Sequence, residues 1–518
     1  MIWRARTVAL AGLVLVWLAS CDFTYSFNEY CKHPGRCSSF ADGGPPTQIS
    51  QGTTLFPVTL TGSHLSYASV EVDPPGAGTV SDLSVQDDRI SLRLSLPHGA
   101  PIGSLVRLRL VWDPQRVDEH RLTDPFVVTP IVVANSGNDA TGEGTHVRPY
   151  ATLARAGQQS GTGDTIHLGP GRYDSIFPDT TTLCDNFAAG LRPGVAVEGE
   201  GAGATFIDGQ VTRTGTCAFN LSSGDQVVQR LTITGFPEGI RASDRSDGGT
   251  GRPRVIDVSI HDGGIGVAAR PGSSLLLQRV TVQEAGRGLV LEGADVMFQE
   301  GNVLDSYRTG VWMIGTGGTL ALDGVRIEHN GLNWGTNFVD GAGLLVASDG
   351  GFAFVDGGYF RDNGGTGITI AGSSNTLAVD NSFLRSGFGD GIGLAVQPSS
   401  SASVYLASTR FEESNWSVRV EDFLVFNAGK GDAGWAVLGN GRSVRIGSND
   451  LQYRWQSSGT GSGNIWDARP GNSNRPLMTF ARTKIDGGWI PPPTTVSSTS
   501  TFYGIRVDSS PGASVSFE

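Results

Sequence analysis

The sequence predicts an all-β chain in which a small β-sandwich precedes a right-handed, single-stranded parallel β-helix. The composition argues against a helical protein, because the 518 residues include 74 Gly and Gly destabilises helix interiors by about 1 kcal/mol relative to Ala. Alternating apolar runs between closely spaced turns predict the sandwich in the first part of the chain. A repeat of twenty-odd residues predicts stacked coils in the remainder.

Residues 46–128 carry the alternation that is typical of strands. Three such runs are LFPVTLTG (55–62), DRISLRLSLP (88–97) and SLVRLRLVW (104–112), and turn residues separate them as in a small β-sandwich. The sequence PTQISQGTTLFPVTLTGSHL, followed by ISLRLSLPHGAPIGSLVRLRLVW, resembles the immunoglobulin-like IPT/TIG family. That resemblance implies a spacer or an interaction module and brings no catalytic residue.

A Gly followed by an apolar residue recurs along residues 131–518, at intervals of 25, 24, 22, 33, 24 and 24 residues. Such a period indicates stacked supersecondary units. Leucine-rich repeats have a similar length, but their Leu/Asn ladder is absent, so three short strands per rung are favoured. The pairs are Gly239-Ile240, Gly264-Ile265, Gly288-Leu289, Gly310-Val311, Gly343-Leu344, Gly367-Ile368 and Gly391-Ile392.

Within the rungs, apolar residues follow the pattern h-x-h-x-x-h-x-h, where h is apolar. Period 2 places the h positions of each run on one face, and the extra residue restores that face only if the chain bends. Each rung therefore has an inner apolar stack and an outward two-residue corner. The matching sets are Leu275, Leu277, Val280 and Val282; Leu320, Leu322, Val325 and Ile327; and Val404, Leu406, Thr409 and Phe411.

The two ends of the predicted β-helix differ from its middle. Residues 131–174 resemble the opening unit of an uncharacterised family of bacterial β-helix surface proteins in the pectate-lyase-like superfamily. The matching pieces are Asn138-Asp139, Gly144-Thr145, RPYATL (148–153), GDTI (163–166) and PGRY (170–173). A helix from Tyr150 to about Gln159 is expected to cover the open end, which would otherwise expose unpaired backbone groups. Residues 423–518 are expected to form irregular rungs and a terminal cap.

The N-terminus predicts export and lipid anchoring. Arg4 and Arg6 precede an apolar run, Val8 to Ala19, that is too short to span a bilayer. The sequence Leu18-Ala19-Ser20-Cys21 resembles a bacterial lipobox, which implies a signal peptide over residues 1–20, a lipid on Cys21 and a tether over residues 21–45. The alternative is an ordinary secretory signal with a coincidental Cys. The expected location is the bacterial cell envelope, at the outer membrane or the cell surface.

Charge and cysteine content restrict the partners further. Loss of the signal peptide removes Arg4 and Arg6 and takes the formal net charge from -12 to -14, which disfavours nucleic acid. Neutral glycans and divalent cations remain compatible. In an oxidising compartment the four other cysteines, which allow three pairings, favour the two disulfides Cys31–Cys37 and Cys184–Cys217. The alternative is a metal site, but no His or Cys pair has zinc spacing.

The outward corner is the first candidate site. Its first position is expected to carry Gln278, Glu300, Asp323, Asp356, Asp380 and Ala407 on successive rungs. Four stacked carboxylates about 4.8 Å apart would repel one another, and a Ca²⁺ ion, which prefers oxygen ligands, could relieve that repulsion. The alternative is that Asp adopts the left-handed backbone of a corner and bonds its own turn.

The second candidate site is the loop column just before each Gly-apolar pair. Aromatic, carboxylate and amide side chains on one side of a solenoid suit a sugar-binding face, and the extra loop GLNWGTNFVDG (331–341) falls in this column. The alternative is that the aromatic rings fold back over the rungs as packing. The candidates are His261, Asp262, Tyr307, Arg308, Trp334, Asn337, Phe338, Asp362, Asn363, Phe388, Asp390, Glu413 and Trp416.

Catalytic signatures are missing from the sequence. The Gly-His-Gly and Asp-Asp motifs of polygalacturonase-like enzymes do not occur, and His261 and His329 lie in turns where small polar residues are ordinary. Two hypotheses follow. The protein is a lipid-anchored module that binds a glycan or another envelope component, with no required cofactor. Alternatively, it is a polysaccharide lyase or glycoside hydrolase that acts on acidic polysaccharide, an idea that rests on fold analogy alone.

Overall fold

The computed structural model divides the chain into two compact units, residues 1–129 and 130–518. It describes residues 48–420 with internal gaps, and it describes only the backbone in residues 402–420 and in the short strands beyond them. The gaps are residues 63–64, 66–68, 112–119, 124, 174–191, 210–216, 223, 245–250, 332–340, 373, 381, 386–391, 397–401, 408–409 and 413–415.

The first unit is a β-sandwich, as the alternation in residues 46–128 predicts. One sheet has the order β1-β8-β6-β3, with β7 also paired to β6, and the other has the order β2-β5-β4. Strands β5 and β6 alternate between buried and exposed residues, so their Leu and Ile side chains fill the core between the sheets. The strands are β1 (Gln48–Ser50), β2 (Phe56–Thr61), β3 (Ser69–Asp73), β4 (Thr79–Val85), β5 (Arg89–Ser95), β6 (Leu105–Val111), β7 (His120–Leu122) and β8 (Phe126–Thr129).

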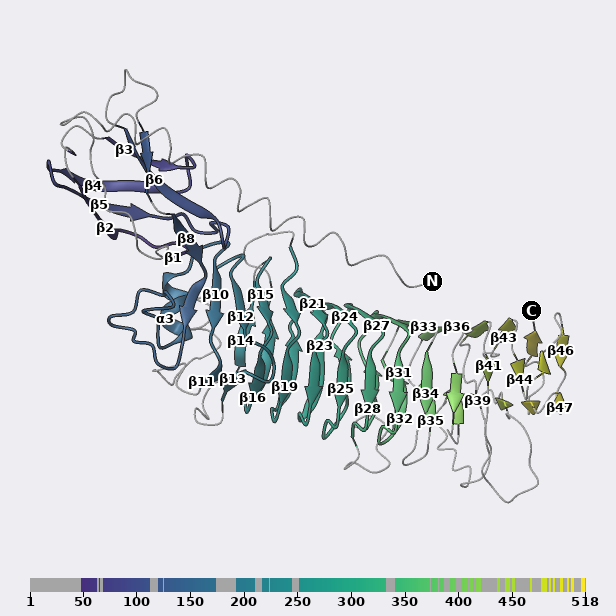
Figure 1. The fold of residues 1–518 in the computed structure, drawn as a ribbon. Coiled ribbons are helices and arrows are strands. Elements are labelled where there is room, and N and C mark those ends of the chain that lie inside the picture. Colours follow the sequence, from purple (N-terminus) through teal and green to yellow (C-terminus); the bar gives the residue numbers. More distant parts are fainter. Residues whose placement is uncertain are drawn as a thin grey trace, which may run out of the picture. The chain divides into compact units, whose positions relative to one another are not determined.

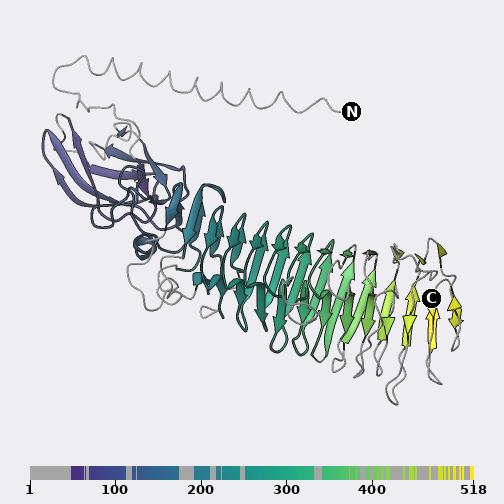
Figure 2. The ribbon, with the colours of Figure 1, turned by 90° about the horizontal axis from the view of Figure 1, so that it is seen from below.

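The second unit is a right-handed parallel β-helix with three long sheets, which confirms the predicted fold class (Figures 1 and 2). Each complete rung contributes one strand to sheet A, then one to sheet B and one to sheet C. Sheet A consists of β9 (Ile131–Val133), β10 (Thr165–Leu168), β12 (Ala196–Gly199), β15 (Val227–Gln229), β18 (Arg254–Ile256), β21 (Ser274–Gln278), β24 (Asp295–Gln299), β27 (Thr319–Asp323), β30 (Phe352–Asp356), β33 (Asn375–Asp380), β36 (Ala402–Ala407), β40 (Ser443–Gly447), β43 (Leu477–Ala481), β49 (Ser514–Phe517) and β46 (Thr494–Val496).

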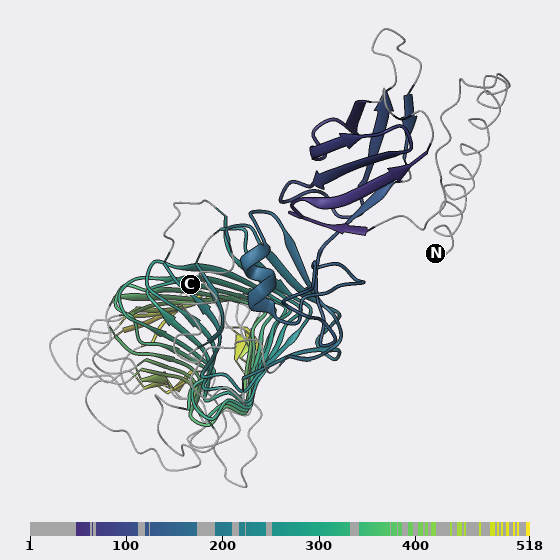
Figure 3. The same cartoon turned by 90° about the vertical axis from the view of Figure 1, so that its left-hand side faces the viewer.

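Sheets B and C follow sheet A along each rung, and Figure 3 looks along the stack so that the sheets appear as sides of one coil. Sheet B consists of β11 (Gly171–Tyr173), β13 (Thr205–Asp208), β16 (Thr232–Thr234), β19 (Ser259–His261), β22 (Thr281–Gln283), β25 (Asn302–Leu304), β28 (Arg326–Glu328), β31 (Tyr359–Arg361), β34 (Phe383–Arg385) and β37 (Arg410–Glu412). Sheet C consists of β14 (Cys217–Leu221), β17 (Glu238–Ala242), β20 (Ile265–Ala269), β23 (Arg287–Glu292), β26 (Val311–Ile314), β29 (Leu344–Val346), β32 (Thr366–Ile370), β35 (Ile392–Val396) and β38 (Trp416–Val420).

Beyond residue 420 the three-sheet pattern is reduced, in line with the looser period of the sequence. Only sheet A continues there as a long sheet, and the remaining described strands form small separate sheets. They are β39 (Ala436–Val437), β41 (Asp450–Leu451), β42 (Trp466–Asp467), β44 (Lys484–Ile485), β45 (Gly488–Trp489), β47 (Thr501–Phe502) and β48 (Ile505–Arg506).

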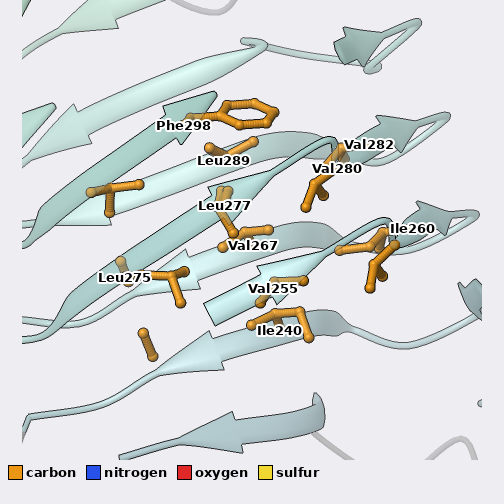
Figure 4. Close-up of a cluster of buried hydrophobic side chains, with 14 of the residues drawn as sticks. Ile240, Val255, Ile260, Val267, Leu275, Leu277, Val280, Val282, Leu289 and Phe298 are labelled. Atoms are coloured by element: carbon orange, nitrogen blue, oxygen red, sulfur yellow. The ribbon is translucent and has the colours of Figure 1, made fainter. Parts of the chain in front are cut away.

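The inner apolar stacks lie where the sequence pattern places them. Leu275, Leu277, Val280 and Val282 have no exposed surface, and neither do their counterparts Leu320, Leu322, Val325 and Ile327. Equivalent side chains from neighbouring rungs pack on one another inside the coil (Figure 4). The core is therefore one continuous apolar column that spans the described rungs.

The glycine repeat needs a correction at two rungs. Val267 is in register with Ile240 and Leu394 with Ile368, so the repeating glycines there are Gly266 and Gly393, not Gly264 and Gly391. The column demands glycine because a β-carbon on Gly266 would lie 2.7 Å from the carbonyl oxygen of Gly288. The repeat thus records a close approach of successive backbones in sheet C.

The corner between sheets A and B has a left-handed backbone, although most of its residues are not glycine. Arg230, Asp257, Arg279 and Glu300 have φ values of 58°, 55°, 51° and 53° on successive rungs. Their charges alternate, and Arg279 donates two hydrogen bonds to Asp257, of 2.6 and 2.9 Å. The hydrogen bond from Arg279 lowers the pKa of the Asp257 carboxyl. The Arg279–Asp257 pair therefore connects neighbouring rungs at residues whose left-handed backbone is otherwise unfavourable for side chains other than glycine.

A short helix covers the N-terminal end of the β-helix (Figure 3). Helix α3 spans Leu153–Gln159 and buries Leu153, Ala156 and Gly157; it begins later than Tyr150, the start that the sequence suggests. Thr152 caps it by accepting a hydrogen bond from the backbone N–H of Arg155. Tyr150 instead forms a β-bridge to Val133 and closes the first rung.

Candidate functional site

One outward column of sheet A, here called the corner column, runs beside the left-handed corner. Residues at the same height on successive strands are direct register partners, one strand spacing apart. The described members are His167, Glu198, Gln229, Ile256, Gln278, Gln299, Asp323, Asp356 and Asp380. Asp323, Asp356 and Asp380 therefore lie in a row, as predicted.

Glu300 does not belong to this row. Asp323 pairs with Gln299, and Glu300 follows it at the left-handed corner position. The repeat pattern of the sequence places Glu300 where the structure has Gln299. In a strand, such a shift by one residue moves a side chain to a different position. The set of four carboxylates that the sequence suggested is therefore wrong at Glu300. Among the described residues no group of three or more His, Cys, Asp or Glu side chains could hold a metal ion, and Ca²⁺ binding by the rest of the row stays a prediction.

The N-terminal end of the corner column is a hydrogen-bonded cluster around His167. The imidazole lies 3.5 Å from Glu198 and 2.9 Å from Glu200, and the amide of Gln229 donates to Glu198 at 2.9 Å. The hydrogen bond to Glu198 raises the pKa of His167, and the same contact lowers the pKa of Glu198. The cluster links the first rungs, and its contribution to stability depends on pH.

His167→Gln is expected to lower the free energy of unfolding by about 1 kcal/mol at pH 5.5. A raised His pKa contributes stability that is fully present below its ordinary value of 6.5 and is lost as the pH rises through the folded-state pKa. The variant should therefore approach the parent protein at pH 9. Urea unfolding of the parent protein and of the variant at both pH values measures this. An equal loss at both pH values would contradict the assignment.

The middle of the outer face of sheet A presents two exposed phenyl rings. Phe352 and Phe354 are 41 % and 37 % exposed, and they lie on the outward side of β30 because Ala353 and Val355 fill the inner positions. Asp356 is the next outward residue on the same strand. The strand therefore presents two aromatic rings and a carboxylate in one line, roughly 7 Å apart.

Small side chains surround both rings. Phe352 is in register with Thr319 and Thr376, and Phe354 with Ala321 and Ala378. Neither neighbouring strand therefore places a bulky side chain beside the rings. We call this set, together with Asp323 and Asp356, the Phe–Asp surface. Gln299 donates a hydrogen bond of 3.3 Å to Asp323, which orients one carboxylate of the surface.

The local sequence predicts that Phe352 and Phe354 face outward, although the glycine repeat does not. In FAFVD (352–356) the inner positions are Ala and Val, so period 2 requires both Phe side chains to face outward. A single apolar residue on an outer face is common. Two adjacent aromatic rings on an exposed strand, however, form a patch that water solvates poorly.

The structure describes only part of the predicted loop column. Tyr307 is 54 % exposed, and the backbone N–H groups of Tyr307 and Arg308 donate to the preceding rung. Trp334, Asn337, Phe338, Phe388, Asp390 and Glu413 lie outside the described residues. Trp416 is not in a loop, because it begins β38 in register with Ile392. The sugar-binding role of this column stays a prediction.

Asp362, another candidate of the loop column, is largely covered. Its residue is 8 % exposed, and its carboxylate lies 3.0 Å from Arg361 and 3.8 Å from His329. The other imidazole nitrogen of His329 lies 3.7 Å from Asp305. Asp305, His329 and Asp362 all have left-handed backbones at the turn after sheet B. Asn363 is also buried there and bonds Asn330 of the preceding rung. These contacts fit a structural role in that turn.

The outer face of sheet B also has aromatic rings, but their faces are occupied. The rings of Tyr359 and Phe383 stack on each other with centroids 4.8 Å apart, and the guanidinium of Arg326 lies 5.4 Å from the other side of the Tyr359 ring. Arg326 also pairs with Glu328. Stacking by a ligand would have to displace these contacts, whereas Phe352 and Phe354 have only small neighbours.

The lipidation and disulfide predictions concern residues that are mostly outside the described part. Cys21, Cys31, Cys37 and Cys184 lie there, and Cys217, the first residue of β14, is buried. Both disulfide pairings stay predictions. No described helix is long and apolar enough to cross a membrane.

The sequence matches no protein-family model and no curated protein. Among solved structures, the chain is 11 % identical to the Dettilon tailspike protein, with a TM-score of 0.34 over 68 % of this chain and 62 % of that one. A GH87 α-1,3-glucanase catalytic domain in complex with nigerose is 12 % identical, with a TM-score of 0.28 over 82 % and 88 %. An alginate lyase from Paenibacillus sp. str. FPU-7 is 11 % identical, with a TM-score of 0.29 over 61 % and 96 %. The chain thus spans less than two thirds of the tailspike protein, and these similarities are too low to transfer a site or an activity.

Proposed function

We propose that this protein binds a neutral glycan on the Phe–Asp surface of sheet A. The observation that carries the proposal is the pair of exposed rings, Phe352 and Phe354, on one strand between neighbours no larger than Thr. A phenyl ring offers an apolar face of the size of a pyranose C–H face, and stacking would remove both from water.

The carboxylates beside the rings supply the polar half of such a site. Asp323 is exposed and Asp356 half-buried; Asp356 follows Phe352 and Phe354 along β30, and Asp323 is its register partner on β27. Ionised carboxylates only accept hydrogen bonds, so they suit sugar hydroxyl groups, which can donate. Hydrogen bonds to a charged acceptor contribute about 1.5–3 kcal/mol each.

The charge of the surface favours a neutral ligand over an acidic one. Asp295, Asp323 and Asp356 are outward residues on β24, β27 and β30, and none of the outward residues on these three strands is Lys or Arg. A uronate chain would bring like charges together, which is unfavourable. This argues against an acidic polysaccharide as the substrate at this surface, and so against the lyase hypothesis here.

A screen of the full-length protein against immobilised glycans, with and without Ca²⁺, tests the proposal. Binding to neutral glycans, with weaker or no binding to polyuronates and no dependence on Ca²⁺, is the expected result. Failure to bind any glycan, or selective binding to polyuronates, would overturn it. Release of reducing ends or unsaturated sugars from the same panel would establish the enzyme hypothesis instead.

The proposed function includes lipid anchoring at Cys21, which would hold the β-helix at the cell envelope. The support is the sequence alone, Arg4 and Arg6 followed by an apolar run and Leu18-Ala19-Ser20-Cys21. A diacyl anchor gives stable membrane attachment, because each buried CH₂ contributes about 0.8 kcal/mol.

Cys21→Ser is expected to abolish lipid attachment and to move the protein from the membrane fraction to the soluble exported fraction. Labelling of expressing cells with a fatty-acid probe, followed by membrane fractionation, measures both effects. Cys31→Ser is the matched control and should leave labelling unchanged. Equal labelling of the Cys21→Ser variant and the parent protein would contradict the anchor.

A further inference from the structure

We infer that the glycan of the proposed function is bound as an internal stretch of a polysaccharide chain that crosses the strands of sheet A. The inference rests on the proposed function and deepens it. The alternatives are a terminal sugar bound at the two phenyl rings, and a chain that follows β30. The outward residues around β30 separate these three arrangements.

An apolar strip runs across the outer face of sheet A through Phe354. Its members are direct register partners on successive strands, none of them is charged, and no register shift interrupts the pairing. Leu276 and Met297 are half-buried, so each keeps part of its apolar surface in contact with water. The strip consists of Leu276 on β21, Met297 on β24, Ala321 on β27, Phe354 on β30 and Ala378 on β33.

A polar row accompanies the strip, two residues further along each strand. It consists of Gln278, Gln299, Asp323 and Asp356, which are also register partners. Carboxylates accept hydrogen bonds, and the Gln amides both donate and accept, so the row suits sugar hydroxyl groups. From β21 to β30 the strip and the row are parallel over about 14 Å, for strand spacings of about 4.8 Å. This length exceeds that of a single sugar ring, and so it suits a chain.

The direction along β30 offers fewer contacts. Gly350-Gly351 lies directly before Phe352, and Gly357-Gly358 directly after Asp356. Neither end of the strand therefore continues into a side chain that could hold a further sugar. A chain that followed β30 would meet two rings and one carboxylate and then only glycine backbone.

The neighbours of the rings do not form a wall that would select the end of a chain. Phe354 lies between Ala321 and Ala378, and Phe352 lies between Thr319 and Thr376. A site for a terminal sugar is concave and stops the chain on one side. With side chains this small on both neighbouring strands, a chain can pass over Phe354 and continue in both directions.

Calorimetric titration of the full-length protein tests the inference. The probes are the disaccharide and the hexasaccharide of the neutral glycan that the screen finds to bind most tightly, and the hexasaccharide is expected to bind at least tenfold more tightly. Met297→Ser makes the strip polar two strands from β30. It is expected to weaken hexasaccharide binding at least fivefold and to leave disaccharide binding unchanged.

Asp295→Ser is the matched control, because it changes another outward residue of β24 that lies outside the strip and the polar row. This variant should bind both probes as the parent protein does. Urea unfolding of both variants checks that the β-helix is intact, so that a loss of binding reports on the surface.

The outcomes separate the inference from the proposed function. Equal affinities for the disaccharide and the hexasaccharide overturn the inference and leave the proposed function standing. Hexasaccharide binding that Met297→Ser leaves unchanged also overturns it, because a chain that crosses the strands has to pass Met297. Absence of binding to every neutral glycan in the screen overturns the proposed function and the inference together.

Discussion

Phe298→Ala is expected to lower the free energy of unfolding by about 3–5 kcal/mol, the usual loss for a buried aromatic residue. Phe298 is fully buried between Leu277 and Leu322 of the neighbouring rungs. Its ring occupies the space beside Gly301, where a β-carbon would collide with it. Truncation would leave a cavity in a core whose rungs constrain one another, so the site has little room to collapse.

Two variants make this expectation specific to the core. Phe298→Leu places Leu where the next rung has Leu322 and should cost less than Phe298→Ala, because it leaves a smaller cavity. Phe354→Ala removes an outward ring and should change stability by no more than about 0.5 kcal/mol. Urea unfolding followed by circular dichroism measures all three variants. Similar losses for Phe298→Ala and Phe354→Ala would show that the assignment of inner and outer faces is wrong.

Replacing both Phe352 and Phe354 by alanine is expected to weaken binding to a neutral glycan by at least 100-fold. Hot-spot residues of a binding site typically lose about 2 kcal/mol or more on truncation, and each 1.4 kcal/mol corresponds to a tenfold change in Kd. Titration of the parent and the double variant with the tightest-binding glycan of the screen measures the loss.

Tyr307→Ala is the informative comparison for that experiment. Tyr307 is the most exposed of the described aromatic residues, at 54 %, but it belongs to the loop column and not to the Phe–Asp surface. The Tyr307→Ala variant should bind glycan as the parent protein does. If Tyr307→Ala loses affinity and the Phe352/Phe354 variant keeps it, the binding face is the loop column that the sequence suggested, and the Phe–Asp surface is not the site.

The sequence alone determined the coil and its inner face. Glycine and turn residues at a recurring interval, with the h-x-h-x-x-h-x-h pattern, predict an inner stack, and Leu275, Leu277, Val280 and Val282 are fully buried as expected. This works because burial acts on every rung in the same way, so the pattern repeats and can be read without coordinates. The outward row of Asp323, Asp356 and Asp380 followed from the same period.

Register and neighbourhood were decided only by the tertiary structure. Rungs differ in length by a few residues, so the sequence could not show that Gln299, and not Glu300, stacks beside Asp323. Nor could it show that Phe352 and Phe354 have only Thr and Ala beside them, while Tyr359 is stacked on Phe383. Outward positions have no common burial requirement, so no repeating pattern marks them. Their neighbours come from other rungs and are known only once backbone hydrogen bonds set the register.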